Sequence, residues 1–158
     1  MKIKFACGLL FILAIINSAY AQIVTNCTEE SGAMMCKANE SNVNLMNMKC
    51  NSQNGKTNCS GNYVDKTSSS LHLKCEPALS GVHCSGAASD GTTFKLACTN
   101  DGSDLKCDIS DNKGESATMN CKIGSDGLPN CSAAGNDGSE YKISCNKNGN
   151  NKSCVTEE

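Results

Sequence analysis

The sequence predicts an all-β protein, a disulfide-rich tandem repeat of six β-hairpins in units of 23 to 25 residues. Three observations lead to this fold class. Cysteines recur at two alternating spacings, apolar residues alternate with polar ones before them, and clusters of Gly, Asn, Asp and Ser separate these segments. A helix would need an apolar residue every three or four positions and would not tolerate this density of turn-forming residues.

Residues 1–21 have the composition of a secretory signal peptide. Two lysines precede an apolar run of twelve residues from Phe5 to Ile16, which is too short to span a bilayer. The small-x-small sequence Ala19-Tyr20-Ala21 predicts cleavage before Gln22. We therefore expect a secreted, extracellular protein that is not inserted in a membrane after cleavage.

The mature chain, residues 22–158, is expected to form a single cysteine-rich β repeat domain, since no Pro-rich or long polar linker divides it. It has 12 lysines against 16 acidic residues, a net charge of −4, and no arginine. Nucleic acid is therefore excluded as a partner, because the basic surface that binds phosphate is missing. Trp is absent and only Tyr63, Phe94 and Tyr141 remain as aromatic residues, so covalent bridges must compensate for a small core.

Twelve cysteines remain in the mature chain, an even number that permits full pairing outside the cell. Short gaps of 9 or 10 residues alternate with long gaps of 14 or 16 without exception. This regularity marks a repeat architecture. The cysteines are Cys27, Cys36, Cys50, Cys59, Cys75, Cys84, Cys98, Cys107, Cys121, Cys131, Cys145 and Cys154.

The segment before the first cysteine of each unit reads as a half-buried strand. Positions two and four residues upstream are mostly apolar, and the interleaved positions are mostly polar. This period of two places each cysteine on the buried face. The upstream pairs are Ile23 and Thr25, Met46 and Met48, Leu71 and Leu73, Phe94 and Leu96, Ala117 and Met119, and Tyr141 and Ile143.

Turn sequences between the strands predict hairpins and, with them, a disulfide register. If Asp101-Gly-Ser-Asp104 forms a turn, Cys98 lies opposite Cys107, within reach of a disulfide. The same reasoning pairs each cysteine with its partner across the short gap. The rival register bonds across the long gaps, for example Cys107 to Cys121, and leaves Cys27 and Cys154 to join only if the chain ends meet.

Three arrangements of the six hairpins would cover a one-sided apolar sheet. We favour a long meander folded into a sandwich. The alternatives are a closed barrel and a solenoid whose coil is one repeat unit.

No catalytic, cofactor-binding or metal site is expected. The only histidines of the mature chain are His72 and His83, and the register sets them about four residues apart along the strand direction, roughly 13 Å, too far to share a metal. Neither histidine lies in a nucleophile or carboxylate-pair motif. The Asp-Gly loops lack the alternating ligands of a calcium loop. We therefore expect a protein that is not an enzyme.

Five Asn-x-Ser/Thr sequons are candidate N-glycosylation sites, on strand positions that face outward if the cysteines face inward. They lie at Asn26, Asn39, Asn58, Asn130 and Asn151. Three of them precede a cysteine directly, where disulfide closure competes with glycosylation. This makes Asn39 and Asn151 the better candidates.

The stretch from Cys84 to Asp104 resembles the cyanovirin-type lectin repeat, which also places two cysteines at this separation before an Asn/Asp-Gly turn. The resemblance covers about an eighth of the chain and implies carbohydrate binding. The following residues, Leu105-Lys106-Cys107-Asp108, depart from the Ser-rich stretch and Ile-Asp-Leu strand of that family.

Two classes of function remain. The first is an effector-like, inhibitory or ligand protein that presents variable hairpin loops on a rigid scaffold to an extracellular protein, with a glycan-binding module as a subset. The second is a structural component of a matrix or coat, for which repetition and covalent bridges would suffice.

Overall fold

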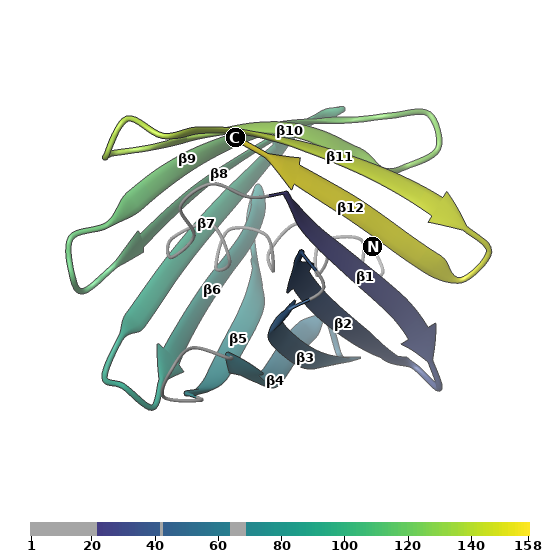
Figure 1. Ribbon diagram of the computed structural model, residues 1–158. Coiled ribbons are helices and arrows are strands. Elements are labelled where there is room, and N and C mark those ends of the chain that lie inside the picture. Colours follow the sequence, from purple (N-terminus) through teal and green to yellow (C-terminus); the bar gives the residue numbers. More distant parts are fainter. Residues whose placement is uncertain (1–21, 42, 64–68) are drawn as a thin grey trace.

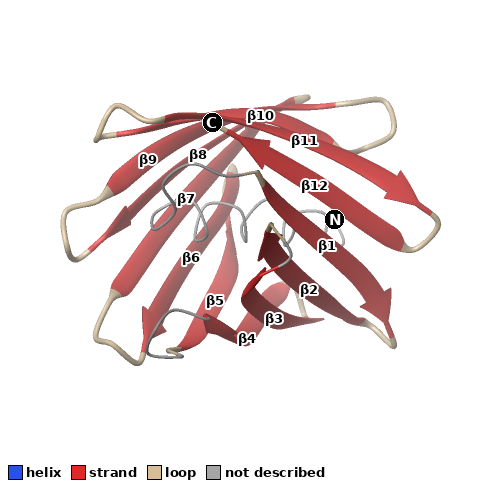
Figure 2. Ribbon diagram, viewed as in Figure 1, coloured by secondary structure: helices blue, strands red, loops and turns tan. Residues whose placement is uncertain are grey.

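The computed structural model describes residues 22–41, 43–63 and 69–158, and the expected signal peptide lies outside these residues. Figure 2 shows that the described elements are all strands joined by short loops. The strands are β1 (Ile23–Glu30), β2 (Ala33–Glu40), β3 (Val43–Gln53), β4 (Lys56–Tyr63), β5 (Ser70–Ala78), β6 (Gly81–Ala88), β7 (Thr93–Asp101), β8 (Asp104–Asp111), β9 (Ser116–Ile123), β10 (Pro129–Gly135), β11 (Glu140–Asn148) and β12 (Asn151–Glu157).

Each strand pairs antiparallel with its neighbours in sequence, and the two ends of this meander meet to close a barrel. Figure 1 shows β1 beside β12, where Val24 lies opposite Val155. The all-β prediction and its meander order are confirmed, but the favoured sandwich is wrong, and the barrel that stood as an alternative is what forms. Closure satisfies the backbone N–H and C=O groups that two free edge strands would leave unpaired.

The six disulfides follow the predicted register and clamp each hairpin across its two strands. Cys98 lies opposite Cys107, with Thr99 opposite Lys106 as the turn requires. In all six bridges the paired Cα atoms are 4.0 or 4.1 Å apart. The bonded pairs are Cys27–Cys36, Cys50–Cys59, Cys75–Cys84, Cys98–Cys107, Cys121–Cys131 and Cys145–Cys154.

The long-gap register is excluded by the pairing between hairpins. Across β2 and β3, Cys36 lies opposite Met48, and Cys50 lies opposite Met34. Both cysteines therefore lie opposite a buried methionine of the neighbouring hairpin and not opposite another cysteine. The interior alternates covalent bridges with apolar side chains around the ring.

The barrel interior contains the residues that the period of two predicted. The residue two positions before each first cysteine is buried in every unit. Phe94 and Tyr141 are only half-buried and pack against this core. Besides cysteines, this core cluster contains Ile23, Met34, Ala38, Met46, Met48, Leu71, Leu73, Leu96, Leu105, Ile109, Met119, Ala133 and Ile143.

Gly61 lies two residues after Cys59, at a point where β4 and β3 approach closely. A Cβ at this position would fall on the carbonyl oxygen of Asn47 and lie 2.9 Å from the Cα of Met48. Only a residue without a side chain fits there. Asn54 and Gly55 make the adjoining turn with φ of 52° and 79°, as a type I′ hairpin requires.

Candidate binding groove

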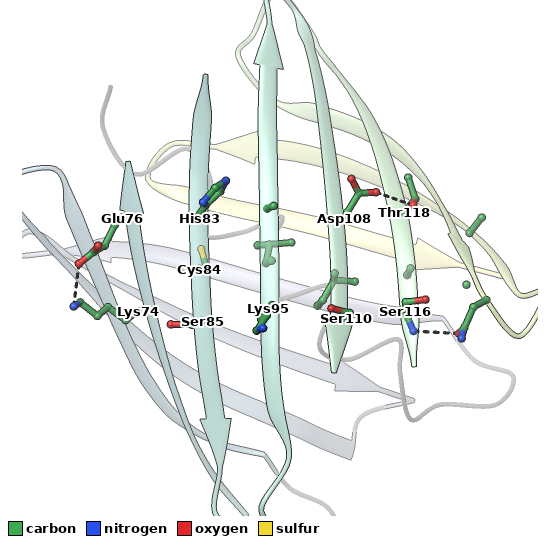
Figure 3. A pocket seen from close by; sticks show the side chains of 17 residues that line it. Lys74, Glu76, His83, Cys84, Ser85, Lys95, Asp108, Ser110, Ser116 and Thr118 are labelled. Atoms are coloured by element: carbon green, nitrogen blue, oxygen red, sulfur yellow. Dashed lines mark hydrogen bonds and ion pairs between the residues drawn. The ribbon is translucent and has the colours of Figure 1, made fainter. Parts of the chain in front are cut away.

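A groove of about 970 Å³ crosses the outer face of the barrel over β5 to β10. Figure 3 shows its polar side chains projecting from adjacent strands. We call it the outer groove. Its outward-facing lining consists of Lys74, Glu76, His83, Ser85, Lys95, Ala97, Asp108, Ser110, Ser116, Thr118, Ala134 and Asn136.

The floor of the outer groove exists because small side chains occupy successive strands at neighbouring positions. Ser85 on β6 lies opposite Lys95 on β7, and Lys95 lies opposite Ser110 on β8. One step along the strands, Ala97 lies between His83 and Asp108. Short serine and alanine side chains leave a depression between the longer charged ones.

Charges of both signs line the outer groove. At one side Glu76 forms ion pairs with Lys74 at 2.9 Å and with Lys56 at 3.3 Å. The hydrogen bond from Lys74, and then that from Lys56, hold the pKa of the Glu76 carboxyl below its ordinary value. These side chains are about half-exposed, so the pairs orient the carboxylate and add little stability.

Further into the outer groove, Asp108 accepts a hydrogen bond from the hydroxyl of Thr118 at 2.8 Å (Figure 3). Lys95 has no ion-pair partner among the described residues. Its ammonium group and the second oxygen of Asp108 are therefore available to a ligand. The groove can donate and accept hydrogen bonds. It offers the cation of Lys95 and the anion of Asp108 to a ligand.

The two histidines lie on the outer face, and the structure does not bring them together. His83 lies opposite Glu76, four residues along β5 from His72, which is the separation that the sequence predicted. His72 itself lies opposite Ala87. In the described part of the chain, no group of three or more His, Cys, Asp or Glu side chains could hold a metal ion. The prediction that the protein is not an enzyme stays a prediction.

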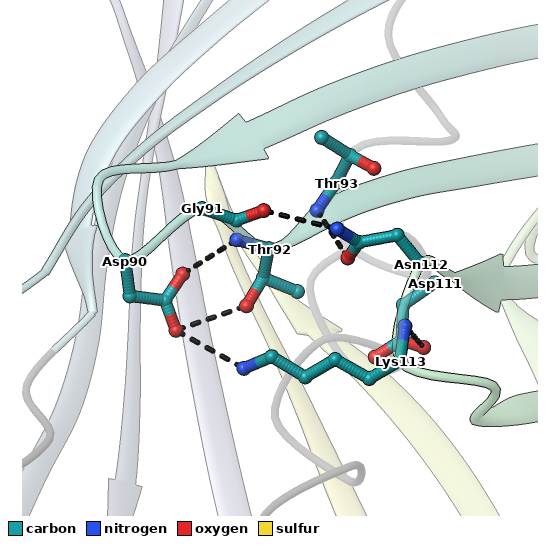
Figure 4. A network of polar contacts seen from close by, with 7 residues as sticks. All are labelled: Asp90, Gly91, Thr92, Thr93, Asp111, Asn112 and Lys113. Atoms are coloured by element: carbon teal, nitrogen blue, oxygen red, sulfur yellow. Dashed lines mark hydrogen bonds and ion pairs between the residues drawn. The ribbon is translucent and has the colours of Figure 1, made fainter.

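The Asp-Gly loops use their polar groups within the fold. Figure 4 shows Asp90 accepting hydrogen bonds from the backbone N–H and the hydroxyl of Thr92, at 2.8 and 2.9 Å, and pairing with Lys113 of the next loop at 3.3 Å. The Thr92 bonds hold the pKa of Asp90 below its ordinary value. Ser139 lowers the pKa of Asp137 in the same way.

An asparagine repeats at the same place in two of these loops and ties each loop to the preceding one. Asn112 accepts a hydrogen bond from the N–H of Thr93 and donates one to the carbonyl of Gly91 (Figure 4). Asn136 makes the same two bonds to Ser116 and Gly114. Hydrogen bonds therefore join the three loops 89–92, 112–115 and 136–139 to one another in sequence order.

The five sequon asparagines all lie in strands. Four are exposed, and Asn39 is half-buried. Asn58 lies in a smaller groove of about 490 Å³ over β3 to β6, and Asn130 in one of about 530 Å³ over β7 to β11. The pairing of Cys84 with Cys75 and of Cys98 with Cys107 places the lectin-like stretch across two hairpins.

Comparisons with protein-family models, with curated proteins and with solved structures find no match to this chain. Within residues 22–41, 43–63 and 69–158, no helix is long and apolar enough to cross a membrane. The groove residues were not identified from the sequence as a site. The available signal was the set of polar positions that alternate with the buried ones, but this set surrounds the whole barrel.

Proposed function

We propose that the protein is a secreted, non-enzymatic interaction protein that binds an extracellular protein partner through the outer groove. Six disulfides support an oxidising, extracellular environment. The observation that carries the proposal is the outer groove itself, whose volume lies near the upper end of the range of about 300 to 1,000 Å³ typical of ligand sites.

The scaffold favours a preorganised site. Apart from Asn136, the lining residues lie on strands, and β5 to β10 form three hairpins that are each clamped by a disulfide. Little conformational entropy is therefore lost when a partner binds. Because almost all of the lining lies on strands, we place the binding surface there and not on the hairpin loops that the sequence favoured.

The chemistry of the lining favours a polypeptide with charges of both signs. Lys95 suits a carboxylate of the partner, Asp108 suits a lysine or arginine, and the serines between them can bond to a backbone. Phe94 and Tyr141 pack against the core, and the lining contains no Phe, Tyr or Trp side chain on which a sugar ring could stack. Since all described strand edges are paired, a discrete protein is also favoured over a sheet-forming matrix component.

The test compares two variants that each place a tryptophan on the outer face. Ala97→Trp fills the floor of the outer groove, and Lys37→Trp places the same side chain on exposed β2, away from it. The oxidised mature protein is used to capture partners from extracellular fluid of its source, and affinities for the purified partner are then measured. We expect Ala97→Trp to weaken binding at least about tenfold, a loss near 1.4 kcal/mol, and Lys37→Trp to leave it unchanged.

Equal affinities of the two variants would contradict the groove as the binding site. If binding disappears when the partner is deglycosylated, the ligand is a glycan on the partner and not its polypeptide. Recovery of the native protein only in an insoluble extracellular layer would favour the structural alternative.

A further inference from the structure

Three of the five sequons gather on one side of the barrel. Asn151 begins β12, Asn26 lies in β1 and Asn39 in β2, which are adjacent strands in the ring. We call these strands the β12–β1–β2 sector. In the ring, β1 is six positions from β7 in either direction, so this sector lies opposite the middle of the outer groove.

The outer groove itself contains no sequon. Asn136 is the one asparagine in its lining, and it is followed by Asp137 and Gly138, which do not make an acceptor sequence. The other two sequons, at Asn58 and Asn130, lie in the smaller grooves on the flanks. A glycan at either of these positions would cover the approach to the outer groove.

The order in which the cysteines emerge during synthesis distinguishes the sequons at Asn58 and Asn130 from the sequon at Asn26. The cysteine after Asn58 bonds to Cys50, and the cysteine after Asn130 bonds to Cys121, so in both cases the partner has already been made. These bridges can close as soon as the sequon emerges. The cysteine after Asn26 waits for Cys36, which comes nine residues later.

Asn39 and Asn151 have no adjacent cysteine. Asn39 lies where the pairing of two strands is irregular, and Asn151 is the first residue of a strand. The register between β2 and β3 shifts between Ala38 and Asn39. Asn151 follows the turn after β11, is exposed, and accepts a hydrogen bond from the hydroxyl of Thr28 at 2.9 Å. A sugar on the amide nitrogen of Asn151 leaves that accepting oxygen free to keep the bond.

We propose that N-linked glycans occupy the β12–β1–β2 sector, at Asn26, Asn39 and Asn151, and that Asn58 and Asn130 remain unmodified. The barrel then has one glycan-covered side and one uncovered side that presents the outer groove. This inference rests on the secretion in the proposed function but not on the identity of the partner.

The full chain, residues 1–158, is expressed in cultured eukaryotic cells, and the protein in the medium is treated with peptide-N-glycosidase in heavy-oxygen water. Each occupied asparagine becomes a labelled aspartate that peptide mass analysis locates. We expect label at Asn26, Asn39 and Asn151, with Asn26 the least occupied, and none at Asn58 or Asn130. The triple variant Asn26→Gln/Asn39→Gln/Asn151→Gln should lose the mass shift, whereas Asn47→Gln, which is not in a sequon, should keep it.

Secreted protein without label in the sector, or with label at Asn58 or Asn130, would overturn the inference and leave the proposed groove function standing. Retention of the chain inside the cell would overturn the secretion on which both depend. If the triple variant does not fold, label on the wild-type chain still decides the question, because the mapping needs no variant.

Discussion

Full reduction of the mature chain at neutral pH is expected to unfold it. On the chain-entropy model, each bridged loop of about ten residues stabilises the fold by about 2.7 kcal/mol, and six such loops by about 16 kcal/mol. This sum is as large as the whole stability of a typical domain, about 5 to 15 kcal/mol. The core offers little to replace it, because the described interior holds no fully buried aromatic side chain.

The measurement is the far-ultraviolet circular dichroism and thermal transition of the reduced, alkylated chain beside the oxidised chain. The double variant Cys98→Ala/Cys107→Ala serves as the control. It should lose the stabilisation of one bridge, about 2.7 kcal/mol, and still fold. A reduced chain that kept its β signal and a sharp transition would show that apolar packing alone holds the barrel.

Removing two buried hydroxyl groups is expected to stabilise the barrel where its ends meet. The strand pair β1–β12 is the seam, formed by Ile23–Thr28 and Asn151–Thr156. It is the one neighbouring pair of the described ring that neither a disulfide nor a connecting segment joins. Within it the hydroxyls of Thr25 and Thr156 are buried with no hydrogen-bond partner.

An unpaired buried hydroxyl costs about 1 to 3 kcal/mol. Thr25→Val and Thr156→Val keep the shape and remove that cost, so each should raise the free energy of unfolding by about that amount. Thr92→Val is the matched control, since the buried hydroxyl of Thr92 bonds to Asp90, and this variant should be destabilised. Chemical denaturation of the oxidised proteins provides the comparison.

Destabilisation by the two seam variants would show that their hydroxyls have partners and that the seam is not a weak point. Amide hydrogen exchange gives a second reading. β1 and β12 should exchange through an opening of lower free energy than the clamped hairpin β7–β8.

The local features of this fold could be predicted because they depend on residues close in sequence. The turn Asp101–Asp104 fixes the register of β7 and β8, and that register places Cys98 opposite Cys107. Period-two alternation identified the buried position before each first cysteine, including Thr25, whose polarity does not match its burial. These are short-range relationships that one hairpin satisfies by itself.

Closure and the groove could not be predicted because they depend on strands that are far apart in sequence. Closure involves all twelve strands, and the groove involves β5 to β10. Whether Val24 meets Val155 is decided by the twist accumulated around the ring, which no single repeat encodes. The floor of the outer groove depends on the register between hairpins, such as Ser85 opposite Lys95. That register is set by the loops between hairpins, such as residues 89–92 and 112–115, so the polar positions were visible in the sequence but their neighbours were not.

Mapping the disulfides of the native, oxidised protein by peptide mass analysis without reduction tests the central claim, a barrel of six individually clamped hairpins, most directly. Digestion between the cysteines should yield Cys98 joined to Cys107, and each other cysteine joined to its partner across the short gap. Cys107 joined to Cys121, or Cys27 joined to Cys154, would contradict the hairpin register and the barrel built on it.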